Sequence, residues 1–176
     1  MDQGVIAARY ARAIYEYAAG KNDETALYEG MQLLNGNFNN QPLLRQVLSD
    51  PTISQEEKIK VITTAGGIGQ DAVAQQVIHV VLANDRAAFM ESIARNYVAE
   101  YRRQKGIQVV YLITVDPDCD GMKHALLEVI AKETPCKIEF HTKTDPNLIG
   151  GFVLEIEDKR LDASVKEQLR LLGSQL

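Results

Sequence analysis

The 176-residue sequence has no tryptophan, only two cysteines and no cluster of positive charge. Cys119 and Cys136 belong to no CxxC pattern, so we expect two free thiols in a reducing compartment, with neither a disulfide nor a metal site. Lysines and arginines are scattered, and the formal net charge is -5. This charge balance gives no electrostatic reason to expect a nucleic-acid partner.

Long hydrophobic runs are also missing. The longest ones, such as VIHVVLA at residues 77–83, are far shorter than the roughly 20 residues of a membrane-spanning helix. The N-terminal segment begins acidic and has no apolar centre of the kind found in a signal peptide. We therefore expect a soluble, intracellular protein with no direct membrane insertion, whose contact with a membrane, if it has one, is made through partners.

One acidic stretch deserves comparison with a calcium site. VDPDCDG at residues 115–121 places three aspartates at alternate positions before a glycine, as an EF-hand loop does. A loop starting at Asp116 needs a bidentate glutamate at its twelfth position, which is Leu127 here. We therefore predict a strand-to-helix turn in which Asp120 caps the helix, and no metal site.

Motifs of catalysis are missing as well. The cluster AGGIG at residues 65–69 follows a predicted helix and is not closed by GK[ST], so it predicts a helix end instead of a phosphate-binding loop. No GxSxG motif or Cys–His arrangement occurs. Acidic side chains can still meet in three dimensions for acid–base chemistry, which one sequence does not show. The residues indicate neither an enzyme nor a cofactor, but an enzyme stays open as an alternative.

Helical periodicity dominates the first 105 residues. Ser54 and Glu57 are spaced as a capping box, in which each side chain binds a free backbone N–H at the helix start. We expect six helices: one over residues 5–19, one capped by Asp23, one over 43–48, one from the capping box to Gly66, one over 71–83, and one through 89–101. Helices of this length with short connections predict a bundle.

At Lys105 and Gly106 the apolar period changes from helical spacing to alternation. We predict strands at 107–115, 137–143 and 150–158, a helix at 121–133 and a short return at 159–162. A second capping box, formed by Ser164 and Glu167, predicts the start of a last helix. The predicted fold class is mostly α, with a six-helix N-terminal domain at 1–105 and a small α+β C-terminal domain at 106–176.

The predicted first and fifth helices carry unusually much apolar surface. In the fifth, apolar side chains occupy almost the whole circumference: Val77, Ile78, Val80, Val81, Leu82 and Ala83. The first is poor in charge on the face that bears Tyr10, Ala11 and Ala13. Two interpretations remain open. Both helices are central in the bundle and buried on every side, or their surplus apolar surface forms a groove for an amphipathic helix of a partner.

Several stretches resemble one known family. The segment DPNLIGGFVLEIEDKRLDASVKEQLRLL at 145–172 resembles the signature of the delta subunit of the rotary ATP synthase, the family that includes the mitochondrial oligomycin-sensitivity-conferring protein. ARYARAIYEYA at 8–18, LSDPTISQEEK at 48–58 and the segment 82–106 resemble further motifs of the family in the same order. Glu157 departs from the pattern, because the family often has glycine there.

The resemblance implies a non-catalytic subunit that joins the catalytic head to the peripheral stalk and resists rotor torque during proton-driven ATP synthesis. In the family, the N-terminal domain takes the N-terminal helix of an α subunit into a groove between its first and fifth helices. The residues at the matching positions here are Ile6, Tyr10, Ala13, Ile14, Gln76, Val77 and Val80. The C-terminal domain meets the C-terminal ends of the stalk b subunits, in a region that here includes Gly151, Phe152, Asp162, Ser164 and Leu169.

The resemblance further implies one copy per complex and no cofactor. The missing transit peptide favours the cytoplasmic face of a bacterial inner membrane. Two alternatives from other classes are a helical interaction module of another complex and an RNA-binding α+β protein. The RNA-binding alternative requires that aromatic side chains such as Tyr111, Phe140 and Phe152 lie exposed among basic residues on the sheet.

Overall fold

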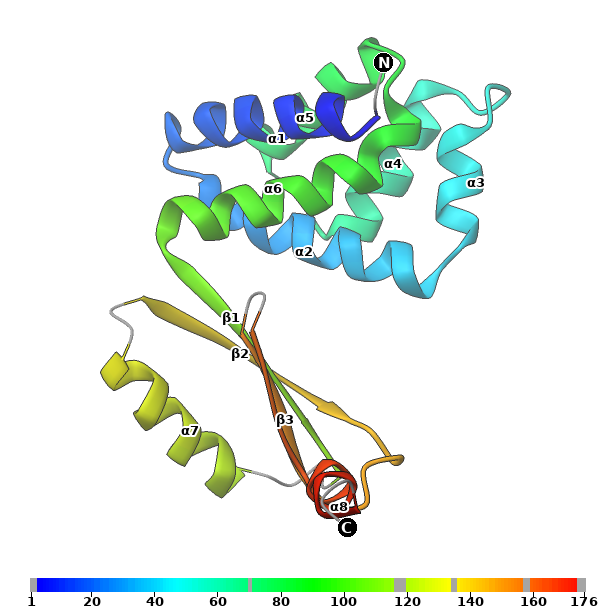
Figure 1. The fold of residues 1–176 in the computed structure, drawn as a ribbon. Helices are drawn as coiled ribbons and strands as arrows, with labels where there is room; N and C mark the ends of the chain where they lie inside the picture. Colours follow the sequence, from blue (N-terminus) through cyan, green and yellow to red (C-terminus); the bar gives the residue numbers. More distant parts are fainter. Residues whose placement is uncertain (1–2, 70, 116–119, 134–135, 157–158, 174–176) are drawn as a thin grey trace. The chain divides into compact units, whose positions relative to one another are not determined.

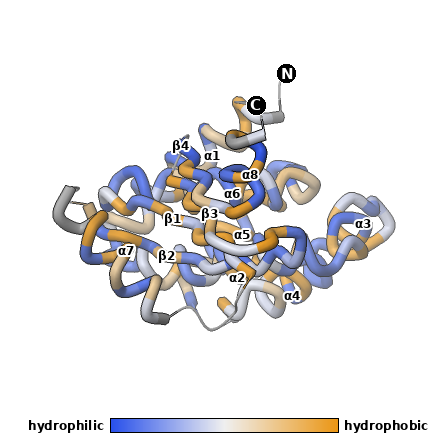
Figure 2. Tube along the Cα trace, turned by 60° about the horizontal axis from the view of Figure 1, so that its bottom comes forward, coloured by the Kyte–Doolittle hydropathy of each residue, from blue (hydrophilic) through white to orange (hydrophobic). Residues whose placement is uncertain are grey.

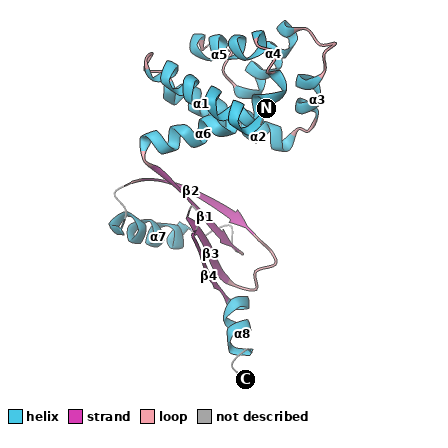
Figure 3. Cartoon of the chain, turned by 45° about the horizontal axis from the view of Figure 1, so that its top comes forward, coloured by secondary structure: helices cyan, strands magenta, loops and turns pink. Residues whose placement is uncertain are grey.

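The computed structural model describes residues 3–69, 71–115, 120–133, 136–156 and 159–173 (Figure 1). The chain divides into two compact units, the first ending at Arg103 and the second beginning at Gln104. The first unit is helical, and the second combines helices with a four-stranded sheet, as Figure 3 shows. The predicted fold class, mostly α with an α+β C-terminal part, is confirmed.

The first unit consists of helices around an apolar core. Its elements are α1 (Gln3–Ala19), α2 (Glu24–Asn40), α3 (Leu43–Ser49), α4 (Gln55–Gly66), α5 (Ala72–Ala83), a 3-10 turn (Ala87–Phe89) and α6 (Met90–Lys105). The largest fully buried side chains include Tyr97 of α6 and Phe38 of α2. Because Phe38 is buried, α2 continues through the polar stretch after Leu34, where Asn37 Nδ2 donates to the Ala65 carbonyl at 2.7 Å.

Local signals determine where α4 and α5 begin and end. The predicted capping box is confirmed: Ser54 Oγ accepts from the Glu57 N–H at 3.3 Å, and Glu57 Oε2 accepts from the Ser54 N–H at 3.2 Å. Helix α4 ends at a left-handed Gly67 with φ 64°, so the glycine cluster is a helix end. Asp71 then caps α5, because its Oδ1 accepts from the Val73 and Ala74 N–H groups at 2.8 and 3.1 Å.

Asp23 does not cap α2 in the predicted way. It occupies the N-cap position, but its side chain makes no capping hydrogen bond. The nearby Asp71 carboxyl raises the pKa of Asp23. The residues before α2 and α5 are therefore close together, although they are distant in the sequence.

The Asp23–Asp71 contact makes the stability of the helical unit depend on pH. Because the pKa of Asp23 is raised in the folded state, its contribution to stability is complete below the ordinary aspartate pKa of about 3.9 and is lost as pH rises through the raised value. Asp23→Asn removes the negative charge beside Asp71 at every pH. We expect this variant to have a higher free energy of unfolding than the wild type at neutral pH.

Urea unfolding at a series of pH values measures this effect. The difference between Asp23→Asn and the wild type should shrink as the pH falls through the raised pKa of Asp23, because the wild-type carboxyl is then protonated. Glu29→Gln, an exposed change on the same helix, is the control and should give no such trend. A difference that stays constant over the whole pH range would contradict the proposed effect of Asp71 on Asp23.

The second unit is a sheet covered by a helix. Its elements are β1 (Ile107–Thr114), α7 (Asp120–Glu133), β2 (Lys137–Thr144), β3 (Gly151–Ile156), β4 (Lys159–Ser164) and α8 (Val165–Gly173). The strand order is β2-β1-β3-β4, with β1 parallel to β2 and the other pairs antiparallel. The core contains Val110, Leu112, Ile130 and Leu154, and Ile138 and Phe140 of β2 pack against it. In Figure 2, both apolar (orange) and polar (blue) positions occur along α7.

Two predicted caps in this unit differ from the structure. Asp120 is the first residue of α7 and not the residue before it, while 116–119 and Glu157 lie outside the described residues. At α8, Ser164 Oγ accepts from the Glu167 N–H at 3.2 Å as expected. The Ser164 N–H, however, donates to Asp162 Oδ1 at 3.0 Å. The box is not reciprocal because Arg170, one turn further on, holds the Glu167 carboxylate at 2.8 and 2.7 Å.

Candidate partner-binding groove

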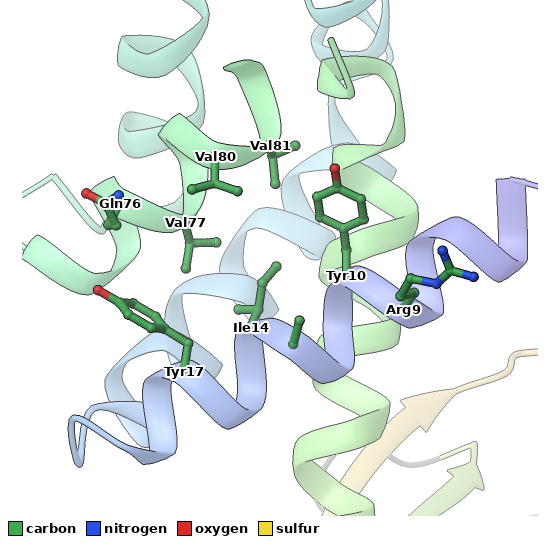
Figure 4. Close-up of a pocket in the computed structure, with 9 residues that line it drawn as sticks. Arg9, Tyr10, Ile14, Tyr17, Gln76, Val77, Val80 and Val81 are labelled. Carbon is green, nitrogen blue, oxygen red and sulfur yellow. The ribbon is translucent and has the colours of Figure 1, made fainter. Parts of the chain in front are cut away.

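An apolar groove lies between α1 and α5, as Figure 4 shows. It has a volume of about 430 Å³ and is lined by Arg9, Tyr10, Ala13, Ile14, Tyr17, Gln76, Val77, Val80 and Val81. Ile14, Val77 and Val81 are buried and form its floor. Tyr17 and Val80 stand at its margins with 42% and 43% of their surface exposed. A monomeric protein gains nothing from this exposure, which is typical of a surface that a partner covers.

The structure brings six of the seven predicted groove residues together. Tyr10, Ala13 and Ile14 from α1 face Gln76, Val77 and Val80 from α5 across the groove (Figure 4). Ile6, the seventh, is half-buried on α1 and does not line the groove.

Three lining residues were missing from the predicted set: Arg9, Tyr17 and Val81. Tyr17 follows Ala13 and Ile14 at helical spacing, so the apolar period of α1 could have found it. Val81 forms part of the buried floor, and the nearly uniform apolar sequence of α5 hides which side it faces. Arg9 is charged, and a search for an apolar face therefore passes over it.

The structure tests the first interpretation of the apolar helices, in which α1 and α5 are buried on every side. The idea that α5 is buried on every side is wrong, because Val80 is exposed beside Gln76 and His79. On α1, the buried apolar residues are Ala7, Ala11, Ile14 and Ala18, of which Ile14 also forms part of the groove floor. Ala13 is exposed, so Ala11 and Ala13, which the sequence places on one charge-poor face, have different environments.

Aromatic contacts hold α1 in place on the side away from the groove. The Tyr15 ring of α1 lies 6.4 Å from Tyr97 and 6.3 Å from Tyr101, both on α6, and Tyr101 stacks on Tyr28 at 4.1 Å. The Tyr97 hydroxyl donates to the Glu24 carbonyl at 3.1 Å, and burial raises the pKa of Tyr97. The phenol therefore stays neutral, and these contacts support α1 as a rigid wall of the groove.

The predicted stalk-contacting residues fall into two groups. Four of them lie at the junction of β3, β4 and α8: Gly151, Phe152, Asp162 and Ser164. Phe152 packs against the core, Ser164 is buried, and Asp162 accepts a hydrogen bond from the Ser164 N–H. That bond, together with the Ser164 side chain, lowers the pKa of Asp162. Leu169 alone presents apolar surface, with 56% of its surface exposed on α8.

Leu169 has exposed apolar neighbours. Ile149 and Val165 are also exposed, and the Val165 N–H donates to the Gly150 carbonyl at 3.0 Å, which brings the segment before β3 beside the start of α8. Val165 and Leu169 are one helical turn apart and share a face. We call Ile149, Val165 and Leu169 the α8 patch.

The three aromatic residues of the RNA-binding alternative do not share a face. Phe140 and Phe152 pack against the core, whereas Tyr111 alternates with the core residues Val110 and Leu112 and lies on the other side of the sheet. Tyr111 stacks on His141 at 5.2 Å and lies beneath Lys143 Nζ at 4.3 Å. The described part of the sheet thus lacks a platform of several exposed aromatics such as single-stranded RNA requires.

Within the described ranges, no three histidine, cysteine or acidic residues are grouped as metal ligands. Among the helices that the structure describes, none has the length and apolar character needed to cross a membrane. A helical unit with an apolar groove, joined to a small α+β unit, defines a protein with a surface of the kind that binds an amphipathic helix.

The chain belongs to the ATP synthase delta (OSCP) subunit family, whose model matches residues 6–176. This finding confirms the family resemblance inferred from the sequence motifs. The ATP synthase subunit delta of Azobacteroides pseudotrichonymphae genomovar. CFP2 is 44% identical over 177 residues, which cover 100% of both chains. That of Parabacteroides distasonis is 41% identical over 97% of this chain and 94% of the relative.

The fold is also similar to that of a solved structure. A chain in the cryo-EM structure of the Toxoplasma gondii mitochondrial ATP synthase hexamer superposes with a TM-score of 0.67 at 20% sequence identity. The match covers 96% of this chain and 96% of that chain. At this identity the similarity concerns the fold, which extends over both units.

Proposed function

We propose that this protein is a non-catalytic peripheral-stalk subunit of a proton-translocating F-type ATP synthase, one copy per complex. It links the catalytic head to the stalk and resists the torque of the rotor. Family membership over residues 6–176 and the apolar groove between α1 and α5 support this function, and the groove is the observation that carries it. Resisting torque requires firm binding without a chemical step, which a helix buried in an apolar groove supplies.

The groove is proposed to hold the N-terminal helix of an ATP synthase α subunit. Its lining on α1 extends from Arg9 to Tyr17, which corresponds to about 12 Å of helix, or roughly two turns. An incoming helix would bury apolar side chains at i, i+3, i+4 and i+7 against the floor residues Ile14, Val77 and Val81. The exposed Ala13 has the smallest side chain of the apolar lining, so it offers space for close approach of a helix backbone.

The C-terminal ends of the stalk b subunits are proposed to bind the second unit at the α8 patch. Ile149, Val165 and Leu169 expose apolar surface there, and the contacts of Asp162 and Ser164 fix the start of α8 beside β3. The proposed location of a subunit with these two partners is the cytoplasmic face of a bacterial inner membrane. They require neither nucleic acid nor a cofactor.

Titration with a peptide that copies the N-terminal segment of the α subunit from the same organism tests the proposal. We expect saturable one-to-one binding by calorimetry, with a Kd of about 1 μM or lower. Hydrogen exchange should show new protection in α1 and α5. A peptide of the same composition in scrambled order is the control. If the native peptide binds no better than the scrambled one, the groove does not have the proposed partner.

A further inference from the structure

The groove has a single charged lining residue, Arg9. In Figure 4, Arg9 and Tyr10 lie at one end of the groove, and Tyr17 and Gln76 lie at the other. Arg9 is exposed and forms no ion pair or hydrogen bond within the described residues. Arg12, its neighbour on α1, instead pairs with Glu16 at 3.1 Å and does not line the groove. The two ends of the groove therefore differ in charge.

This asymmetry has an energetic consequence for anything that covers the groove. A helix laid over Arg9 removes water from the guanidinium group, and the lost hydration has to be replaced by a partner. A carboxylate replaces it best, because charge-assisted hydrogen bonds between arginine and carboxylate are short and can be bidentate. The opposite end, with the Gln76 amide and the Tyr17 hydroxyl, offers only neutral groups.

We propose that the groove selects an amphipathic helix that carries an acidic side chain at the end lying over Arg9, and that Arg9 determines the direction and register of this helix. The inference rests on the proposed function of the groove. Arg9 precedes Tyr10 and lies one turn from Ala13, so the acidic side chain of the partner lies within about one helical turn of one end of its apolar stripe. The apolar floor contributes affinity, and the charged end contributes orientation.

A comparison of Arg9→Gln with Arg12→Gln tests the proposal, using the peptide that copies the N-terminal segment of the α subunit. Both variants remove one exposed arginine from α1, but only Arg9 lines the groove. We expect Arg9→Gln to weaken binding about fivefold, Arg9→Glu to weaken it further, and Arg12→Gln to leave it within about twofold. Added salt should weaken binding to the wild type more than binding to Arg9→Gln.

A double-mutant cycle identifies the partner of Arg9. Each acidic residue of the peptide is replaced in turn by its amide, and each peptide is titrated against the wild type and Arg9→Gln. One replacement should weaken binding to the wild type about fivefold and have no effect with Arg9→Gln. Circular dichroism establishes that each variant is folded.

The outcomes separate the two proposals. If the wild type fails to bind the native peptide, the proposed function itself is wrong. If the wild type binds but Arg9→Gln binds equally well, or if no acidic residue of the peptide couples to Arg9, the groove keeps its partner and the role of Arg9 is overturned.

Discussion

Replacing Val80 with aspartate is expected to leave the free protein folded and to weaken binding of the α-subunit peptide about a hundredfold. Val80 stands at the margin of the groove with 43% of its surface exposed, so a carboxylate there stays hydrated until the partner arrives. In the complex the same carboxylate would be buried against an apolar helix without a hydrogen-bond partner. The expected cost is roughly 3 kcal/mol.

His79→Asp is the matched control for this prediction. His79 is exposed on the same helix and does not line the groove, so the same new charge should leave peptide binding nearly unchanged. Position 13 is less informative, because an aspartate there would lie one turn from Arg9 and could pair with it. Calorimetric titration gives the affinities, and thermal melting followed by circular dichroism reports folding. If Val80→Asp is folded and binds the peptide as tightly as the wild type, the groove is not the binding site of the α-subunit helix.

Replacing Gly151 with alanine is expected to destabilise the second unit by roughly 2–4 kcal/mol. Gly151 has φ 78°, a conformation that costs energy for any residue with a Cβ atom. A Cβ atom at this position would also lie 2.3 Å from the Ala163 carbonyl oxygen and 3.0 Å from Ser164 Cα. Both obstacles are backbone atoms of the paired strand β4, so a change of side-chain rotamer does not relieve the clash.

Hydrogen exchange of the β3 and β4 amides, combined with urea unfolding, measures this loss. Gly121→Ala on α7 is the control, because a Cβ atom there meets nothing within 4 Å. Alanine is the better helix former, so the control should be neutral or more stable by up to about 1 kcal/mol. Amide protection in Gly151→Ala equal to that of the wild type would show that the β3–β4 pairing tolerates a side chain at this position.

Local patterns predicted the elements of the fold because the interactions behind them span few residues. The capping box of Ser54 and Glu57 closes within three positions, and the helix end at Gly67 depends on the conformation of one residue. Alternation of Ile107, Val109, Tyr111 and Ile113 likewise predicted that β1 is a strand, although the positions buried in the core are the intervening Val110, Leu112 and Thr114. The order of motifs identified the family without knowledge of any contact.

The sequence alone did not determine which neighbour each polar side chain meets. Asp23 makes no capping hydrogen bond and lies beside Asp71, and Glu167 binds Arg170 in place of completing a capping box. In both cases the geometry of the folded chain decides the surroundings of the carboxyl. A spacing rule therefore predicts the position of a helix end better than the hydrogen bonds made there.

By itself the sequence determined the fold class, most element boundaries, the family and the two helices that form the groove. The tertiary structure alone decided which side chains of those helices face outward. Ala11 and Ala13 are two positions apart and chemically identical, yet the first is buried in the core and the second lines the groove. Helical period defines a face, but whether that face is covered depends on packing against elements distant in sequence. For the same reason, Arg9 became part of the groove only when α5 was placed opposite it.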